Sequence, residues 1–206
     1  MQPSSRSFVI SMGGQESERR RIAELFVSAF GDKLRVCLGS PDRALEFLTP
    51  HLALEHVLVA RQQGQVVGIA GFHHQGSSLV DVQLSDVIEH YGWIWYLCRG
   101  WLLVFLDRQT EPDNLLMDGI AVAAGFRGMG VGSALLEALS AHAKALGKRS
   151  VRLDVIDTNP AARRLYEERG FVAVDAQDLW ILKWIFGFQH ATTMELRCDE
   201  QGASAG

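Results

Sequence analysis

The sequence predicts an α/β domain built around a mixed β-sheet, and three observations support that fold class. β-rich runs on both sides of a QQGQ turn, over 56–72, are typical of a hairpin. The nearly all-apolar run NLLMDGIAV at 114–122 indicates a strand buried on both faces. Strand and helix patterns then alternate towards the C-terminus, as expected for a sheet covered by helices.

The first half of the chain carries the hairpin, a preceding strand and two helices. SFVISM at 7–12 is compatible with a first strand. Apolar residues at helical spacing predict a helix over 16–30. Pro41 begins a short second helix, which Pro50 interrupts. Residues 76–113 form an insert with a polar entry, a tryptophan-rich stretch and a polar end.

The second half alternates strands and helices. Leu135, Leu139 and Ala143 share one face of an amphipathic helix, and Gly147 ends it. Asn159 has the position of an N-cap before another helix. The expected elements are a strand at 114–122, a helix at 133–146, a strand at 150–156, a helix at 160–169, a strand at 171–174 and a last strand at 190–198.

Length and composition predict a single domain. The chain has 206 residues, of which 48% are hydrophobic and 21% charged, as in ordinary globular proteins. We expect one domain over 1–206, with its ordered core at 7–198. The inserts are expected at 76–113 and 179–188, and 199–206 is expected to be a disordered tail.

The charge, the cysteines and the apolar runs of the chain indicate which partners and which cellular compartment to expect. A net charge of −4 argues against a nucleic-acid partner, which requires a basic face. The three cysteines show no CxxC spacing, and the N-terminus has no apolar core of signal-peptide length, so we expect a cytoplasmic protein. We expect no metal site, because adjacent His73 and His74 point to opposite faces of a strand. The apolar run at 91–106 is too short to span a membrane.

Three alternate glycines follow the buried strand and precede a helix. Gly128, Gly130 and Gly132 would leave backbone N–H groups free at the positive end of the helix dipole, an arrangement that suits phosphates. A P-loop is excluded because no lysine precedes Ser133. A dinucleotide-binding motif is a second alternative, because Asp154 lies where such a motif has its acidic residue. However, the third glycine of that motif is missing, and the stretch does not lie at the start of the domain as the motif normally does. A glycine-rich turn without a ligand is a further alternative.

Two short motifs, separated by one expected helix and one expected strand, carry the most specific functional signal. The first is R-x-x-G-x-G, formed by Arg127, Gly130 and Gly132. The second is N-x-x-A-x-x-x-Y-x-x-x-G-F, formed by Asn159, Ala162, Tyr166, Gly170 and Phe171. Together they resemble the hallmarks of the GNAT superfamily of N-acetyltransferases, which bind acetyl-CoA. Ala124 stands where many members have proline, a departure that removes no chemical group.

The resemblance implies a mostly antiparallel sheet flanked by helices and direct transfer of an acetyl group from acetyl-CoA to an amine. Backbone amides of Ile120 and Val122 would bind the acetyl oxygen and pantetheine, and Asn159 would bind the pantetheine arm. Arg127 would add positive charge beside the pyrophosphate. The implied cofactor-binding residues are Ile120, Val122, Arg127, Gly128, Met129, Gly130, Val131, Gly132, Ser133 and Asn159.

Two residues are candidates for proton transfer. Tyr166 occupies the position where the family commonly places the acid for the departing thiolate; its alternative role is packing on the sheet. Asp118 is the candidate base, because strand alternation would put it on the same face as Ile120 and Val122. A carboxylate buried in an apolar strand is costly unless it has hydrogen-bond partners. The alternative to a catalytic role is therefore a structural one, in which neighbouring amides donate hydrogen bonds to Asp118.

The tryptophans predict the class of acceptor. All 5 lie in the two apolar stretches at 91–106 and 179–188. Left facing water, these stretches would form a large exposed patch, so they must pack on each other, on a second subunit or on a ligand. We predict a pocket for a small amine with an apolar or aromatic body, and a homodimer interface or membrane contact as alternatives. The expected lining residues are Trp93, Trp95, Trp180 and Trp184. A catalytically inactive acyl-CoA sensor is the alternative to an enzyme.

Overall fold

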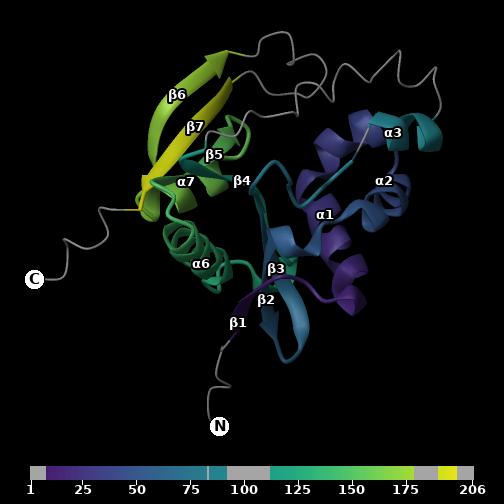
Figure 1. The fold of residues 1–206 in the computed structure, drawn as a ribbon, viewed down its shortest axis with the longest axis horizontal. Helices are drawn as coiled ribbons and strands as arrows, with labels where there is room; N and C mark the ends of the chain where they lie inside the picture. The colour runs from purple at the N-terminus through teal and green to yellow at the C-terminus, as the bar shows by residue number, and fades with distance from the viewer. Residues whose placement is uncertain (1–7, 83, 92–111, 179–189, 199–206) are drawn as a thin grey trace, which may run out of the picture.

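In a computed structural model, which describes residues 8–82, 84–91, 112–178 and 190–198, the chain forms a seven-stranded sheet (Figure 1). Its strands are β1 (Val9–Met12), β2 (Val57–Gln62), β3 (Gln65–His73), β4 (Asn114–Val122), β5 (Ser150–Ile156), β6 (Val172–Asp178) and β7 (His190–Arg197). They lie in the order β1-β2-β3-β4-β5-β7-β6. All neighbouring pairs are antiparallel except β4 and β5, which confirms the mixed, mostly antiparallel sheet.

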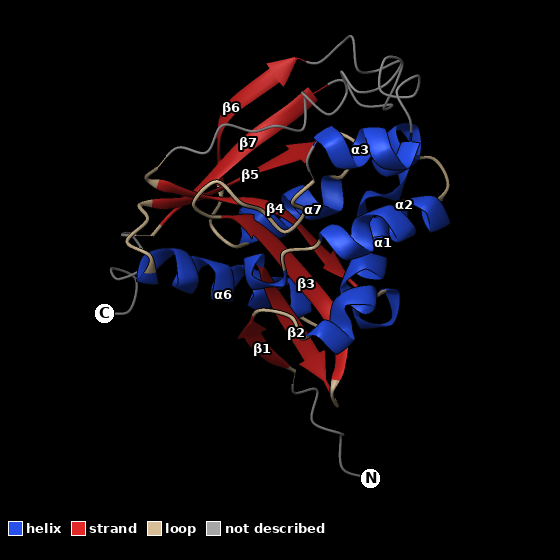
Figure 2. Ribbon diagram, turned by 45° about the vertical axis from the view of Figure 1, so that its right-hand side comes forward, coloured by secondary structure: helices blue, strands red, loops and turns tan. Residues whose placement is uncertain are grey.

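Helices cover both faces of this sheet. They are α1 (Arg19–Leu38), α2 (Pro41–Leu48), α3 (Leu84–Tyr91), α6 (Val131–Ala145) and α7 (Pro160–Glu168). Short 3-10 turns occupy Glu16–Glu18 (η1), Thr49–His51 (η2), Leu54–His56 (η3) and Ala124–Phe126 (η4). Figure 2 shows α6 on one side of the strands and α1 on the other. Among the helices that the structure describes, none combines the length and apolar character needed to cross a bilayer.

The two faces have separate apolar cores. On the first, Leu135 and Leu139 of α6 are fully buried against β4 and β5, together with Tyr166 of α7. On the second, Ile22 of α1 packs with Ile69 of β3. We call these the α6 face and the α1 face. Burying a leucine or isoleucine side chain stabilises the fold by about 1.5–3 kcal/mol, so the helices are held by the apolar stripes read from the sequence.

The predicted bounds hold best where local signals are strong. β4 and β5 begin and end as predicted, and α7 is one residue shorter at its C-terminal end. Ser40 caps α2 by accepting from the Arg43 amide, and Pro41 occupies the first turn. The hairpin turns at Gln63 and Gly64, both with positive φ. α1 extends to Leu38, beyond the predicted end at residue 30.

The beginning of the 76–113 insert belongs to the core. Leu79 is fully buried, and its carbonyl accepts from the Ala53 amide at 2.9 Å. Val80 forms an isolated antiparallel bridge with Leu52. This part of the insert therefore packs on the α1 face. The tryptophan-rich stretch, the second insert and the C-terminal tail lie outside the described residues.

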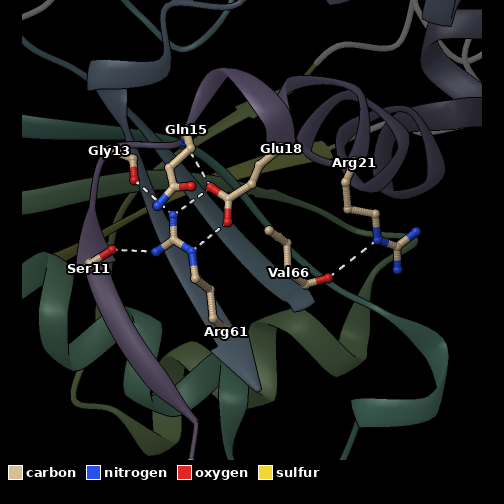
Figure 3. A network of polar contacts seen from close by, with 7 residues as sticks. All are labelled: Ser11, Gly13, Gln15, Glu18, Arg21, Arg61 and Val66. Atoms are coloured by element: carbon tan, nitrogen blue, oxygen red, sulfur yellow. Dashed lines mark hydrogen bonds and ion pairs between the residues drawn. The ribbon is translucent and has the colours of Figure 1, made fainter. Parts of the chain in front are cut away.

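A polar network ties β1 and β2 to the start of α1 (Figure 3). Arg61 of β2 donates two hydrogen bonds of 2.6 Å to the carboxylate of Glu18, and the two side chains are only 17% and 13% exposed. The guanidinium also donates to the Ser11 hydroxyl and to the Gly13 carbonyl. Hydrogen bonding to Arg61 holds the pKa of Glu18 below its ordinary value. The bidentate geometry fixes the edge strand against the helix that follows it.

Candidate active site

β4 and β5 separate soon after they begin. Their parallel pairing joins Asn114–Leu116 to Ser150–Arg152 and includes no later residue of β4. We call this point the β4–β5 fork. The Ala123 amide donates to Val67 of β3 at 2.9 Å, so by antiparallel alternation the peptide groups of Ile120 and Val122 point away from β3. They face the side on which the described part of the chain supplies no pairing strand.

The glycine stretch turns from β4 into α6 beside this fork. Gly128 and Gly130 have φ values of +73° and +86°, which L side chains rarely adopt. Gly132 lies in a tightly packed position: a Cβ there would lie 3.2 Å from Leu165, so the Leu165 side chain would have to shift by a few tenths of an ångström. The three glycines thus permit two left-handed turns and a close approach of α6 to α7 and β4.

The loop presents a row of amides at the start of α6. Ala134 donates to the Gly130 carbonyl and continues the helix, but for the amides from Gly128 to Ser133 no hydrogen-bond acceptor occurs among the described residues. Met129 is half-buried, and the Val131 side chain is 1% exposed in the core. These residues can therefore contribute backbone N–H groups rather than side chains, which suits an anion such as pyrophosphate.

Arg127 and Asn159 border the same region. The Arg127 side chain is exposed, and its Nε donates to the Val122 carbonyl at 3.2 Å, which holds the guanidinium at the end of β4. Asn159 caps α7, with its side-chain oxygen accepting from the Ala162 amide at 3.2 Å. Because the cap uses only the side-chain oxygen of Asn159, its two side-chain N–H groups can donate hydrogen bonds to a ligand.

Tyr166 lies in the core under α7. It is 5% exposed, and its ring centroid is 5.9 Å from that of Phe171. Burial raises the pKa of Tyr166 to about 12. The phenol is therefore protonated at neutral pH, the state that a general acid requires. Packing and proton donation are compatible for this side chain.

Asp118 is not on the face that strand alternation predicts. Gly71 pairs with Gly119 but Phe72 pairs with Met117, so Asp118 is the extra residue of a β-bulge. The bulge shifts the alternation by one residue. As a result Asp118 points to the α1 face, where its Oδ2 accepts from the Leu79 amide at 3.2 Å. Ile120 and Val122 pack with the α6 core instead, so the expectation of a shared face was wrong.

The structure adds one residue that the sequence analysis did not assign to the site. His73, the last residue of β3, places Nε2 2.5 Å from Asp118 Oδ1. His74 belongs to the other face, where burial lowers its pKa and the nearby charges of Lys148 and His56 lower it further. The sequence could not reveal the His73–Asp118 pair, because 76–113 separates the two strands and the bulge is set by their pairing. The four tryptophans assigned to the acceptor pocket lie outside the described residues.

Comparisons with known proteins agree with this architecture. The sequence is similar to YycN, an uncharacterized N-acetyltransferase of Bacillus subtilis (strain 168), with 30% identity over 76 residues. That alignment covers 37% of this chain and 49% of YycN, so the match spans about half the length of this curated relative. A crystal structure of an acetyltransferase superposes with a TM-score of 0.60 at 26% identity, covering 93% of this chain and all of the other.

A second solved structure shows the same fold at lower identity. YncA of Salmonella typhimurium, solved with its cofactor acetyl-CoA, has a TM-score of 0.61 at 18% identity, and the alignment covers 96% of this chain and 98% of YncA. The chain thus has the overall fold of these two solved structures. The family model for the Acetyltransferase (GNAT) family matches residues 20–171, and the chain belongs to that family.

Proposed function

We propose that the protein is an N-acetyltransferase that moves an acetyl group from acetyl-CoA to an amine by direct attack. The observation that carries the proposal is the β4–β5 fork, with the peptide groups of Ile120 and Val122 facing away from β3 and the glycine loop beside it. Membership in the GNAT family supports the reaction class. The presence of acetyl-CoA in YncA supports the choice of co-substrate.

The cofactor would be held by backbone groups on the α6 face. The amides from Gly128 to Ser133 would bind the pyrophosphate, with Arg127 adding charge. The amides of Ile120 and Val122 would bind the thioester oxygen and the pantetheine, and Asn159 would donate to the pantetheine arm. Donors fixed in a strand need no reorganisation as the oxyanion develops, which is the usual origin of a large electrostatic contribution.

Two proton transfers accompany the reaction. The departing thiolate would take a proton from Tyr166, whose pKa of about 12 keeps it protonated. The acceptor reaches the site as an ammonium ion and must lose a proton before it can attack. We place that proton transfer at the Asp118 carboxylate and its contact His73, beside the fork.

The acceptor would enter on the α1 face. Phe30 of α1 packs directly over Gly119, because a Cβ on that glycine would lie 2.1 Å from the phenyl ring. The rings of Phe26 and Phe30 are 4.7 Å apart between centroids. This aromatic surface borders Asp118 and, with the tryptophan-rich inserts, favours a small amine with an apolar or aromatic body. Dimerisation through the inserts and a cytoplasmic location remain predictions from the sequence.

Calorimetry and an amine panel test the proposal. We expect acetyl-CoA to bind the purified protein, and CoA to be released faster when aromatic or long-chain primary amines are added. Initial rates should show intersecting lines when both substrates are varied, because direct attack requires both to be bound. Acetyl-CoA binding without turnover on any amine would favour the sensor alternative, and failure to bind would refute both.

A further inference from the structure

His73 and Asp118 form a close pair where β4 leaves β5. Leu116 is the last residue of β4 to pair with β5, and it is also the cross-strand partner of His73. Asp118 follows two residues later. The two side chains are 20% and 14% exposed, so the pair is shielded but reachable from solvent.

Each carboxylate oxygen of Asp118 has one close neighbour. Its Oδ2 accepts from the Leu79 amide, and its Oδ1 lies 2.5 Å from His73 Nε2. An ionised carboxylate can only accept, so in the neutral imidazole the hydrogen sits on Nε2 and the lone pair on Nδ1. Among the described residues, no polar atom forms a hydrogen bond with His73 Nδ1. In enzymes, a catalytic base is usually held in its orientation by a third group in this way.

Resting on the proposed function, we propose that His73 is the catalytic base and that Asp118 is the positioning residue that fixes its tautomer. The pyrophosphate loop and α6 lie on one face of the sheet, and the pair lies on the other with Leu79 and Phe30. The pair therefore lies on the face from which we propose that the amine approaches the fork.

The steps balance as follows. The ammonium group of the acceptor gives one proton to His73 Nδ1, and the lone pair so released attacks the thioester carbon. The C–N bond forms while the carbonyl electrons move to the oxygen. When the intermediate collapses the C–S bond breaks, sulfur keeps the electron pair and Tyr166 protonates it. The second proton of the nitrogen replaces the one that Tyr166 gave, and His73 returns its proton to water. The products are the N-acetyl amine, CoA and one proton.

The tautomer can be measured without an acceptor. In ¹⁵N-labelled protein at a pH where His73 is neutral, long-range proton–nitrogen spectra should show His73 as the Nε2–H form, with His73→Gln providing the assignment. Asp118→Asn should switch the ring to the Nδ1–H form. Leu79 requires an oxygen at the Oδ2 position, so the new NH₂ must face His73 Nε2 and turn it into an acceptor. An Nδ1–H ring in the wild type, or no change in Asp118→Asn, would overturn the inference.

Kinetics with the most reactive amine of the panel supply the second test. His73→Gln and Asp118→Asn should each lower kcat/KM by about 10²–10⁴-fold and leave the acetyl-CoA Kd within about threefold. Asp86→Asn is the matched control, because His51 Nε2 lies 3.6 Å from Asp86 in a second such pair, and it should not change the rate. Loss of activity in Asp118→Asn but not in His73→Gln would make Asp118 the base. A wild type that binds acetyl-CoA but acetylates no amine would overturn the proposed function, even with the tautomer as expected.

Discussion

At the scale of single residues, Tyr166 is both a core side chain and the candidate acid. Replacing it by phenylalanine removes one hydroxyl and keeps the ring that packs near Phe171. We expect Tyr166→Phe to lower kcat by about 10²–10⁴-fold, with the acetyl-CoA Kd nearly unchanged. Because the pKa of Tyr166 is about 12, the phenol should stay protonated up to pH 10, and its deprotonation should not lower the wild-type kcat in that range. Steady-state rates and calorimetry measure both quantities.

Tyr91 provides the matched control for this substitution. Its hydroxyl donates to the Leu38 carbonyl at 3.0 Å, in the contact between α3 and α1. Tyr91→Phe should lower the free energy of unfolding by about 0.5–1.5 kcal/mol and leave kcat unchanged. Equal activity of Tyr166→Phe and wild type would assign Tyr166 to the core alone.

Residue identity predicted the chemistry of the site better than its geometry. The motifs around Gly130 and Asn159 were visible because each is set by a local turn or cap. The face of Asp118 was predicted wrongly, because a single extra residue in β4 reverses the alternation beyond it. Such a bulge arises from pairing with β3, across 76–113, and leaves no local pattern in the sequence.

At the scale of elements, the glycine loop can be tested at one position. Gly130→Asp places a carboxylate among the amides proposed for pyrophosphate and should abolish acetyl-CoA binding in calorimetry. Gly147→Asp is the control, since Gly147 lies past the other end of α6 with a φ of +70° and equal free space. It introduces the same charge and a similar backbone strain, yet it should keep the wild-type affinity. Comparable binding by both folded variants would contradict the loop's role.

We expect the contact between Arg61 of β2 and Glu18 of η1 to stabilise the fold less at acidic pH. Hydrogen bonding to Arg61 lowers the pKa of Glu18 from its ordinary 4.5, so its contribution to stability is full above that value. It is lost as the pH falls through the lowered pKa. Glu18→Gln should therefore reduce the free energy of unfolding at pH 7 by about 1–3 kcal/mol, and the difference from wild type should shrink below pH 4.5. Urea unfolding at several pH values measures it.

Glu24 supplies the comparison for Glu18. It forms ion pairs with Arg20 and Arg21 on the exposed side of α1, and its side chain is 39% exposed. Exposed pairs contribute little, so Glu24→Gln should change stability by less than about 1 kcal/mol at any of these pH values. A constant effect of Glu18→Gln from pH 7 to pH 3 would show that its pairing does not depend on ionisation.

Element bounds were predictable to the extent that they depend on neighbours in sequence. Buried strands such as β4 carry their own apolar signal, and Ser40 with Pro41 marks the start of α2. The point at which β4 and β5 separate has no such signal, because it depends on where two strands joined by α6 stop pairing. The expectation that the amides of Ile120 and Val122 bind a ligand came from family resemblance, and no residue pattern marks where the two strands separate.

At the scale of the whole molecule, the sheet would separate the two proposed substrates. The glycine loop, α6 and α7 lie on the face proposed for acetyl-CoA, and α1 with the His73–Asp118 pair lies on the other. The two proposed substrates would meet at the β4–β5 fork, where β4 no longer pairs with β5. Substitutions on the two faces should therefore have separable kinetic effects, which a single shared pocket would not produce.

Phe30 allows this separation to be tested, because it contacts the acceptor side of β4 at Gly119 and takes no part in the proposed proton transfers. Phe30→Ala should raise the KM for an arylalkylamine such as tryptamine by about tenfold or more, since removing an apolar contact of 1–3 kcal/mol has that effect. The KM for ethanolamine should change less, and the acetyl-CoA Kd should stay the same. Phe8→Ala removes a partly buried phenyl ring from the α6 face and controls for general loosening. If Phe30→Ala weakened acetyl-CoA binding while leaving both amine KM values unchanged, the proposed division of the substrates between the two faces would be wrong.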